Sequence, residues 1–175
     1  GDKLVVSSKN YSMKQKVRQP QAATVVLENS TGEIKAMIGG RGVKGKQLHN
    51  RADSPRQPGS TIKPIGSYGP ALQMSYEYAK DSKKMKLDNS DGSDWGDYIT
   101  ASSVINDSPV KNRGKAWPKN WYSGYKGQMT LRHAVQQSVN TCSVKTFNQI
   151  GADYSVSMLK KCGVTSIQEK GDAND

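Results

Sequence analysis

The sequence has 175 residues, of which 34% are hydrophobic and 7% aromatic, and its formal net charge is +11 at pH 7. This composition suits part of a globular domain with a modest core, and no apolar run approaches the roughly 18 residues of a membrane-spanning helix. Two cysteines and two histidines without metal-ligand spacing exclude a structural zinc site. The basic clusters lack the interleaved aromatic residues of nucleic-acid binding, so we expect a solvated surface and no nucleic-acid partner.

The first part of the chain predicts a basic lead-in, a β-hairpin and a loop. Residues 1–22 are polar and basic, as in a linker, which puts the expected domain at 23–175. Residues 23–28 are apolar and β-branched, turn-forming residues follow, and residues 33–38 alternate with period two. We therefore expect a hairpin whose second strand is half buried, followed by a Gly-rich loop over 39–59.

The remaining chain is expected to be mainly helical apart from an irregular stretch at 74–128, which carries turn signals and three tryptophans. Pro70 is expected to strain the end of the first helix, because proline removes a backbone hydrogen bond. The later helices are indicated by apolar residues at helical spacing and by glycines that end them. The expected helices cover 60–73, 130–138, 141–150 and 153–162.

The strongest chemical signal is a Ser-x-x-Lys pattern within residues 56–64. Ser60 and Lys63 are three residues apart, so they share one face of a helix and the ammonium can reach the hydroxyl. A serine hydroxyl becomes a good nucleophile when a neighbouring base takes its proton, and a partly desolvated lysine can be that base. The alternative is that Ser60 merely caps a helix, and the pattern alone occurs often by chance.

A second signal is Ser138-Val139-Asn140, at the point where one predicted helix gives way to the next. A hydroxyl and an amide two residues apart on a tight turn can both point into a cleft. Ser138 could then relay protons while Asn140 hydrogen-bonds a substrate amide. The alternative is an ordinary polar helix end, where serine and asparagine are common.

These patterns in this order resemble penicillin-binding proteins and class A β-lactamases, which share Ser-x-x-Lys with a later Ser-x-Asn and a Lys-Thr-Gly. The similarity covers residues 23–167 and is closest to the transpeptidase domain of class A, the bifunctional high-molecular-mass type. The segments that carry it, besides the two motifs, are 25–40, 50–52, 117–121 and 127–132.

The resemblance implies a role for each motif residue. Ser60 would be the acylated nucleophile and Lys63 its proton partner. Ser138 would transfer a proton to the leaving group, and Asn140 would hold the acyl-donor peptide. The resemblance implies no cofactor and no metal.

Two departures from the family pattern narrow the expectation. Val139 stands where β-lactamases prefer Asp, and no Glu-x-x-Leu-Asn follows to supply their deacylating glutamate, which favours a β-lactam target. No Lys-Thr-Gly or Lys-Ser-Gly occurs in the sequence. We therefore expect an α/β chain that is the N-terminal portion of a β-lactamase/transpeptidase-like fold, an antiparallel sheet with a helical subdomain, truncated before the later sheet strands.

The expected function is D,D-transpeptidase acyl transfer between peptidoglycan stem peptides, on the extracytoplasmic face of a bacterial membrane to which the parent protein is anchored. The expected partners are stem peptides, β-lactams and the C-terminal half of the domain, which could be a second chain. The alternatives on the same fold are a D,D-carboxypeptidase or β-lactamase, and a noncatalytic β-lactam sensor.

The two cysteines flank two consecutive predicted helices. Cys142 begins one and Cys162 ends the next, and a tight turn at Gly151 would make these helices antiparallel and bring the thiols near each other. A disulfide is one reading, and two free thiols are the other.

Overall fold

The computed structural model describes residues 20–42 and 49–167, which divide into two compact units at residues 56 and 57. Each unit is described by itself. Most of the predicted lead-in at 1–22 lies outside the described residues, so its role as a linker stays a prediction.

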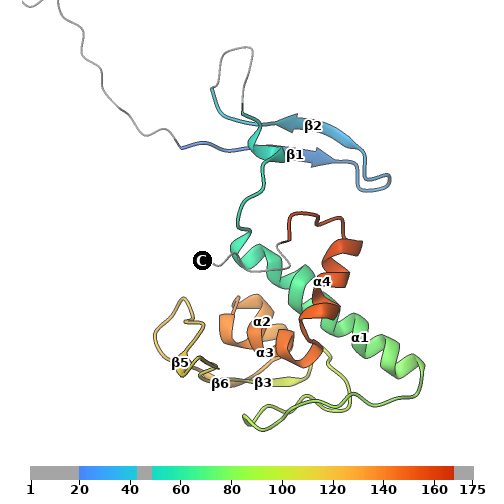
Figure 1. Cartoon of the computed structure of the whole chain (residues 1–175), viewed down its shortest axis with the longest axis vertical. Helices are drawn as coiled ribbons and strands as arrows, with labels where there is room; N and C mark the ends of the chain where they lie inside the picture. The colour runs from blue at the N-terminus through green and yellow to red at the C-terminus, as the bar shows by residue number, and fades with distance from the viewer. Residues whose placement is uncertain (1–19, 43–48, 168–175) are drawn as a thin grey trace, which may run out of the picture. The chain divides into compact units, whose positions relative to one another are not determined.

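The first unit contains the predicted hairpin. Strand β1 (Thr24–Leu27) pairs antiparallel with β2 (Ile34–Ile38), and the turn between them closes through Gly32 at a φ of 75° (Figure 1). The expectation that the second strand is half buried is wrong, because every residue of β2 is exposed. Within the described part of this unit the sheet has two strands, so no third strand or helix packs on its apolar side chains. A short 3-10 turn, η1 (Arg51–Asp53), follows.

The second unit begins with a continuous helical segment that changes its winding twice. It starts as a 3-10 turn, η2 (Gly59–Ile62), passes through a π turn, η3 (Pro64–Tyr68), and continues as α1 (Gly69–Lys80). The predicted start of this helix is confirmed within one residue. The predicted end at residue 73 is wrong, because the helix runs through Pro70 to Lys80.

The helix continues past Pro70 because another segment replaces the hydrogen bond that proline cannot donate. The carbonyl of Gly66, four residues before Pro70, accepts a hydrogen bond of 2.5 Å from the hydroxyl of Ser155 in α4 (Ala152–Lys161). The π turn ends at the same place, where the Gly69 N–H bonds to the Pro64 carbonyl. Widening of this kind makes room for a proline ring inside a helix.

The stretch expected to be irregular contains short strands. Strand β3 (Val104–Asp107) pairs antiparallel with β6 (Gly127–Thr130), and β4 (Lys111–Asn112) pairs with β5 (Lys115–Ala116). These strands have two to four residues, too short for an alternating pattern to stand out in the sequence. Asp107 at the end of β3 pairs with Gly127 at the start of β6, so the connection formed by residues 108–126 begins and ends at the same edge of this strand pair.

Three helices follow, as predicted: α2 (Leu131–Gln136), α3 (Asn140–Ile150) and α4. The Thr130 hydroxyl caps α2 by accepting from the His133 N–H, and Gly151, at a φ of 80°, separates α3 from α4. Figure 1 shows α2 and α3 close to the β3–β6 pair. Within the described residues, no helix has both the length and the apolar character needed to cross a bilayer.

One hydrophobic cluster joins these elements and fixes the position of α3. It contains the fully buried side chains of Trp95 and Ile105 together with residues of α1, α2 and α3. Cys142 is buried in this cluster, whereas Cys162 is exposed, and both are free thiols. The cysteines therefore form no disulfide here, in line with the second of the two expected alternatives.

Candidate active site

The two predicted motifs meet at the side chain of Lys63. Its ammonium donates hydrogen bonds to the Ser138 carbonyl (2.6 Å), the Ser138 hydroxyl (3.0 Å) and the Asn140 Oδ1 (2.5 Å). An ammonium has three hydrogens, so these bonds use its full donor capacity. The structure thus brings together three of the four candidate residues, although the two motifs lie about 75 residues apart.

Burial makes the Lys63 side chain a weaker base than an exposed lysine. Only 9% of the Lys63 surface is exposed, and a cavity of about 260 Å³ beside it has Trp117, Phe147 and Leu159 among its walls. Desolvation lowers the pKa of Lys63 below its usual value of 10.5, and a smaller interaction with Cys142 opposes this shift. At a given pH, a larger fraction of Lys63 is therefore in the neutral amine form, which can accept a proton, than in an exposed lysine.

Ser138 presents its two oxygen atoms through an unusual backbone conformation. Its φ is 51°, in the left-handed region that a residue other than glycine seldom adopts. The N–H of Ser138 bonds to the Val135 carbonyl and that of Val139 to the Ala134 carbonyl, which is the Schellman ending of α2. Strain of this kind persists only where the surrounding structure enforces it, and it often marks a functional site.

Asn140 is the first residue of α3, and its amide group is held at both ends. Its Nδ2 donates to the Lys119 carbonyl at 2.7 Å, so its Oδ1 faces the ammonium of Lys63. The Asn140 backbone N–H donates to the Asn120 Oδ1 at 3.0 Å. The amide has two hydrogens, and within the described residues the second one has no acceptor.

Ser60 lies in the first turn of the helical segment, and its residue is exposed. Gly59 precedes it at a φ of 58°, a backbone conformation that glycine adopts without strain, and the Lys63 N–H bonds to the Ser60 carbonyl. Within the described residues the Ser60 hydroxyl has no hydrogen-bond partner. The structure therefore leaves this hydroxyl accessible, one helical turn from Lys63, but does not join the two side chains.

Sequence reasoning missed the residues that orient Asn140, namely Lys119 and Asn120. They belong to the segment 117–121, which was singled out only for its resemblance, and no catalytic pattern marks them. Within the described residues no group of three or more His, Cys, Asp or Glu side chains could hold a metal ion.

The comparisons with known proteins decide the family. A family model of the penicillin binding protein transpeptidase domain matches residues 22–98 and 95–174. The chain belongs to this family. Penicillin-binding protein 1A of Clostridium tetani (strain Massachusetts / E88) is 36% identical over 170 residues, which cover 93% of this chain and 18% of that protein. Penicillin-binding protein 1F of Bacillus subtilis (strain 168) is 35% identical over 151 residues, which cover 86% of this chain and 18% of that protein.

A third relative, penicillin-binding protein 1A of Clostridium perfringens (strain 13 / Type A), is 30% identical over 169 residues, with 93% of this chain and 22% of that protein covered. The chain thus spans about a fifth of the length of these curated relatives. The resemblance to the transpeptidase domain of penicillin-binding proteins is confirmed.

Proposed function

We propose that this chain carries the nucleophile and the proton-transfer residues of a serine D,D-transpeptidase that cross-links peptidoglycan stem peptides. The observation that carries the proposal is the buried Lys63 ammonium, which bonds to both Ser138 and Asn140. A partly desolvated lysine that bonds to a second hydroxyl, one helical turn from a helix-borne serine, suits proton transfer in acyl exchange. The family match and the three relatives support the same reaction class.

In the proposed first half-reaction, neutral Lys63 takes the hydroxyl proton of Ser60 as the Ser60 oxygen attacks the penultimate D-alanine carbonyl. The peptide bond breaks, the terminal D-alanine leaves, and its nitrogen receives a proton through the Ser138 hydroxyl. The product is an acyl ester on Ser60. The free amide hydrogen of Asn140 would bind the acyl-donor peptide.

In the second half-reaction, an amine from a neighbouring stem peptide attacks the ester carbonyl and loses a proton to the Ser138 and Lys63 pair. Ser60 recovers its hydrogen, and a cross-linking amide is formed. β-Lactams would acylate Ser60 in the same way, with the opened ring retained as the acyl group. The backbone N–H of Ser60, at the start of the helix, would stabilise the developing oxyanion.

The context of the reaction is proposed with it. The site would work outside the cytoplasm in a membrane-anchored protein, with stem peptides and β-lactams as ligands. Residues 23–175 would be the N-terminal portion of the transpeptidase domain, completed by later sheet strands in the same or a second chain. The exposed strands β1 and β2 would then belong to a larger antiparallel sheet, which would cover their apolar side chains.

The test is covalent penicillin labelling of a complete transpeptidase domain that contains this sequence, followed by intact-mass spectrometry. Ser60→Ala should abolish labelling, because it removes the attacking oxygen. Ser157→Ala is the matched control, since the Ser157 hydroxyl is exposed on α4 and bonds only to the Tyr154 carbonyl within the described residues. Labelling that persists on Ser60→Ala would refute the assignment.

A second measurement separates transpeptidation from the alternatives. Incubation with a stem peptide and an amine acceptor should give a cross-linked product. Release of D-alanine without cross-linking would support a D,D-carboxypeptidase instead, and acylation by penicillin without turnover of peptide would support a β-lactam sensor.

A further inference from the structure

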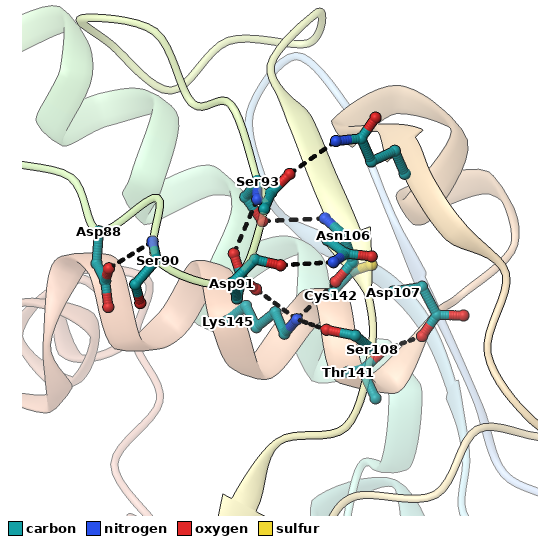
Figure 2. Close-up of polar contacts among 12 residues, drawn as sticks. Asp88, Ser90, Asp91, Ser93, Asn106, Asp107, Ser108, Thr141, Cys142 and Lys145 are labelled. Carbon is teal, nitrogen blue, oxygen red and sulfur yellow. Dashed lines mark hydrogen bonds and ion pairs between the residues drawn. The ribbon is translucent and has the colours of Figure 1, made fainter.

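The carboxylate of Asp107 lies at the end of β3, and it accepts hydrogen bonds from two separate segments, the connection before β6 and the first turn of α3. Only 1% of its surface is exposed. Its Oδ1 accepts from the Asn120 Nδ2 (2.8 Å) and the Thr141 hydroxyl (2.5 Å). Its Oδ2 accepts from the Tyr122 hydroxyl (2.5 Å) and the Lys126 N–H (2.8 Å). Figure 2 shows the Thr141 side chain of α3 directed at this carboxylate.

Asn120 carries the effect of Asp107 to the beginning of α3. While its Nδ2 donates to Asp107, its Oδ1 accepts from the backbone N–H groups of Asn140 (3.0 Å) and Thr141 (3.3 Å). These N–H groups have no acceptor inside the helix, so Asn120 acts as an N-terminal cap supplied from another segment. The neighbouring Lys119 carbonyl then fixes the Asn140 side-chain amide.

We propose that Asp107 is a positioning residue of the active site: through Asn120 it fixes the first turn of α3, so that the Asn140 Oδ1 faces the ammonium of Lys63. This inference rests on the proposed function, because it takes Lys63 as the proton partner of Ser60. Asp107 has no contact with Lys63. It would act through Asn120 and through the Thr141 hydroxyl, both of which hold the first turn of α3 and with it Asn140.

An ionised carboxylate is the one side chain that satisfies this position. All four of its partners donate hydrogen bonds, and a carboxylate is an acceptor on both oxygens. Burial alone would raise the pKa of Asp107, but hydrogen bonds, from Thr141 first and then from Tyr122, Lys126 and Asn120, lower it below 3.8. Asparagine at this position would turn an NH₂ group toward two donors and lose their hydrogen bonds.

A second polar cluster holds α3 independently of Asp107. The Lys145 ammonium forms an ion pair with Asp91 and donates to the Asn106 carbonyl (2.6 Å) and the Ser108 hydroxyl (2.7 Å), as Figure 2 shows. Its three hydrogens are all used within the protein, which indicates a structural role. Because this cluster and the core also anchor α3, we expect loss of the Asp107 carboxylate to disturb the first turn of α3 while the helix stays in place.

The test uses the full 175-residue chain with labelled lysine and follows the Cε and Nζ signals of Lys63 by NMR. In Asp107→Asn these signals should move toward those of exposed lysines, because the Asn140 Oδ1 no longer faces the ammonium. Asn120→Ala should give the same shift while leaving the carboxylate intact, so it decides the matter if Asp107→Asn does not fold. Asp91→Asn is the matched control, since it also removes a carboxylate that holds α3 but should leave the Lys63 signals unchanged.

The same variants are then assayed for penicillin acylation in a complete transpeptidase domain. A displacement of about 1 Å in a reacting group can lower a rate by roughly 100-fold, which is the loss expected for Asp107→Asn and Asn120→Ala. Unchanged Lys63 signals in both variants, or equal shifts in Asp91→Asn, would overturn the positioning role. Labelling of Ser60→Ala would instead overturn the proposed function, so the two failures are distinguishable.

Discussion

The passage of the helical segment 59–80 through Pro70 depends on the Ser155 hydroxyl, and this can be tested by removing that hydroxyl. In Ser155→Ala the carbonyl of Gly66 loses its donor, and Pro70 cannot supply another. The Ser155 side chain is 1% exposed and Gly66 is also buried, so water has little access to the orphaned carbonyl. The substitution removes a single oxygen atom, so it leaves only a small cavity.

The expected cost follows from the loss of that donor. Leaving a buried acceptor unsatisfied costs about 1–3 kcal/mol. With an m-value near 2 kcal/mol per molar urea, the unfolding midpoint should fall by roughly 0.5–1.5 M at an unchanged m-value. Ser157→Ala, two residues further along α4, removes an exposed hydroxyl and should leave the midpoint nearly unchanged.

A double-mutant cycle identifies the cause. Pro70→Ala restores an N–H four residues after Gly66, so Ser155→Ala should cost less in that background than in the original sequence. Urea unfolding followed by circular dichroism measures all four proteins. The reasoning is refuted if Ser155→Ala unfolds at the original midpoint, or if its cost is the same with proline and with alanine at position 70.

Three further outcomes are expected. The isolated chain should be acylated at Ser60 about 10²–10³-fold more slowly than a complete domain, which is the usual effect of removing one oxyanion donor. The resemblance implies that a later strand with the Lys-Thr-Gly motif supplies a second donor beside the Ser60 N–H, and the sequence contains no such motif. Fluorescent penicillin labelling compares the two rates. Hydrogen bonds lower the pKa of Asp107 despite the opposing effect of burial. The ionised carboxylate should therefore contribute its full share to the free energy of unfolding above its unfolded pKa of 3.8, and this share should be lost as the pH falls through the lower folded pKa. In urea titrations at different pH values, Asp107→Asn should reduce this loss of stability in acid. Iodoacetamide should modify exposed Cys162 in the native chain but Cys142 only after unfolding, because burial raises the pKa of Cys142 to about 12, and peptide mass mapping distinguishes the sites.

The sequence predicts those features that depend on neighbouring residues. The hairpin and the last three helices follow from local patterns and from glycines such as Gly151. The extension of the first helix past Pro70 could not be predicted in the same way, because the compensating hydroxyl of Ser155 lies 89 residues beyond Gly66.

The candidate site shows the same division. Lys63 and Ser138 are recognisable because each belongs to a short motif. Asp107 carries no such mark, since its partners come from separate segments and its role exists only once the chain has folded. Its place at the end of a strand, just before Ser108 and a proline, suggests only a turn.

The three consecutive residues of the turn at 138–140 face two different environments. Ser138 and Asn140 face Lys63, whereas Val139 is fully buried and packs in the hydrophobic cluster with Ala134. The side chain at position 139 is therefore constrained by the space and polarity of the interior and not by contacts with Lys63. A designer who introduced the aspartate typical of β-lactamases at position 139 would place a carboxylate in an apolar interior and would also have to supply a partner for it there.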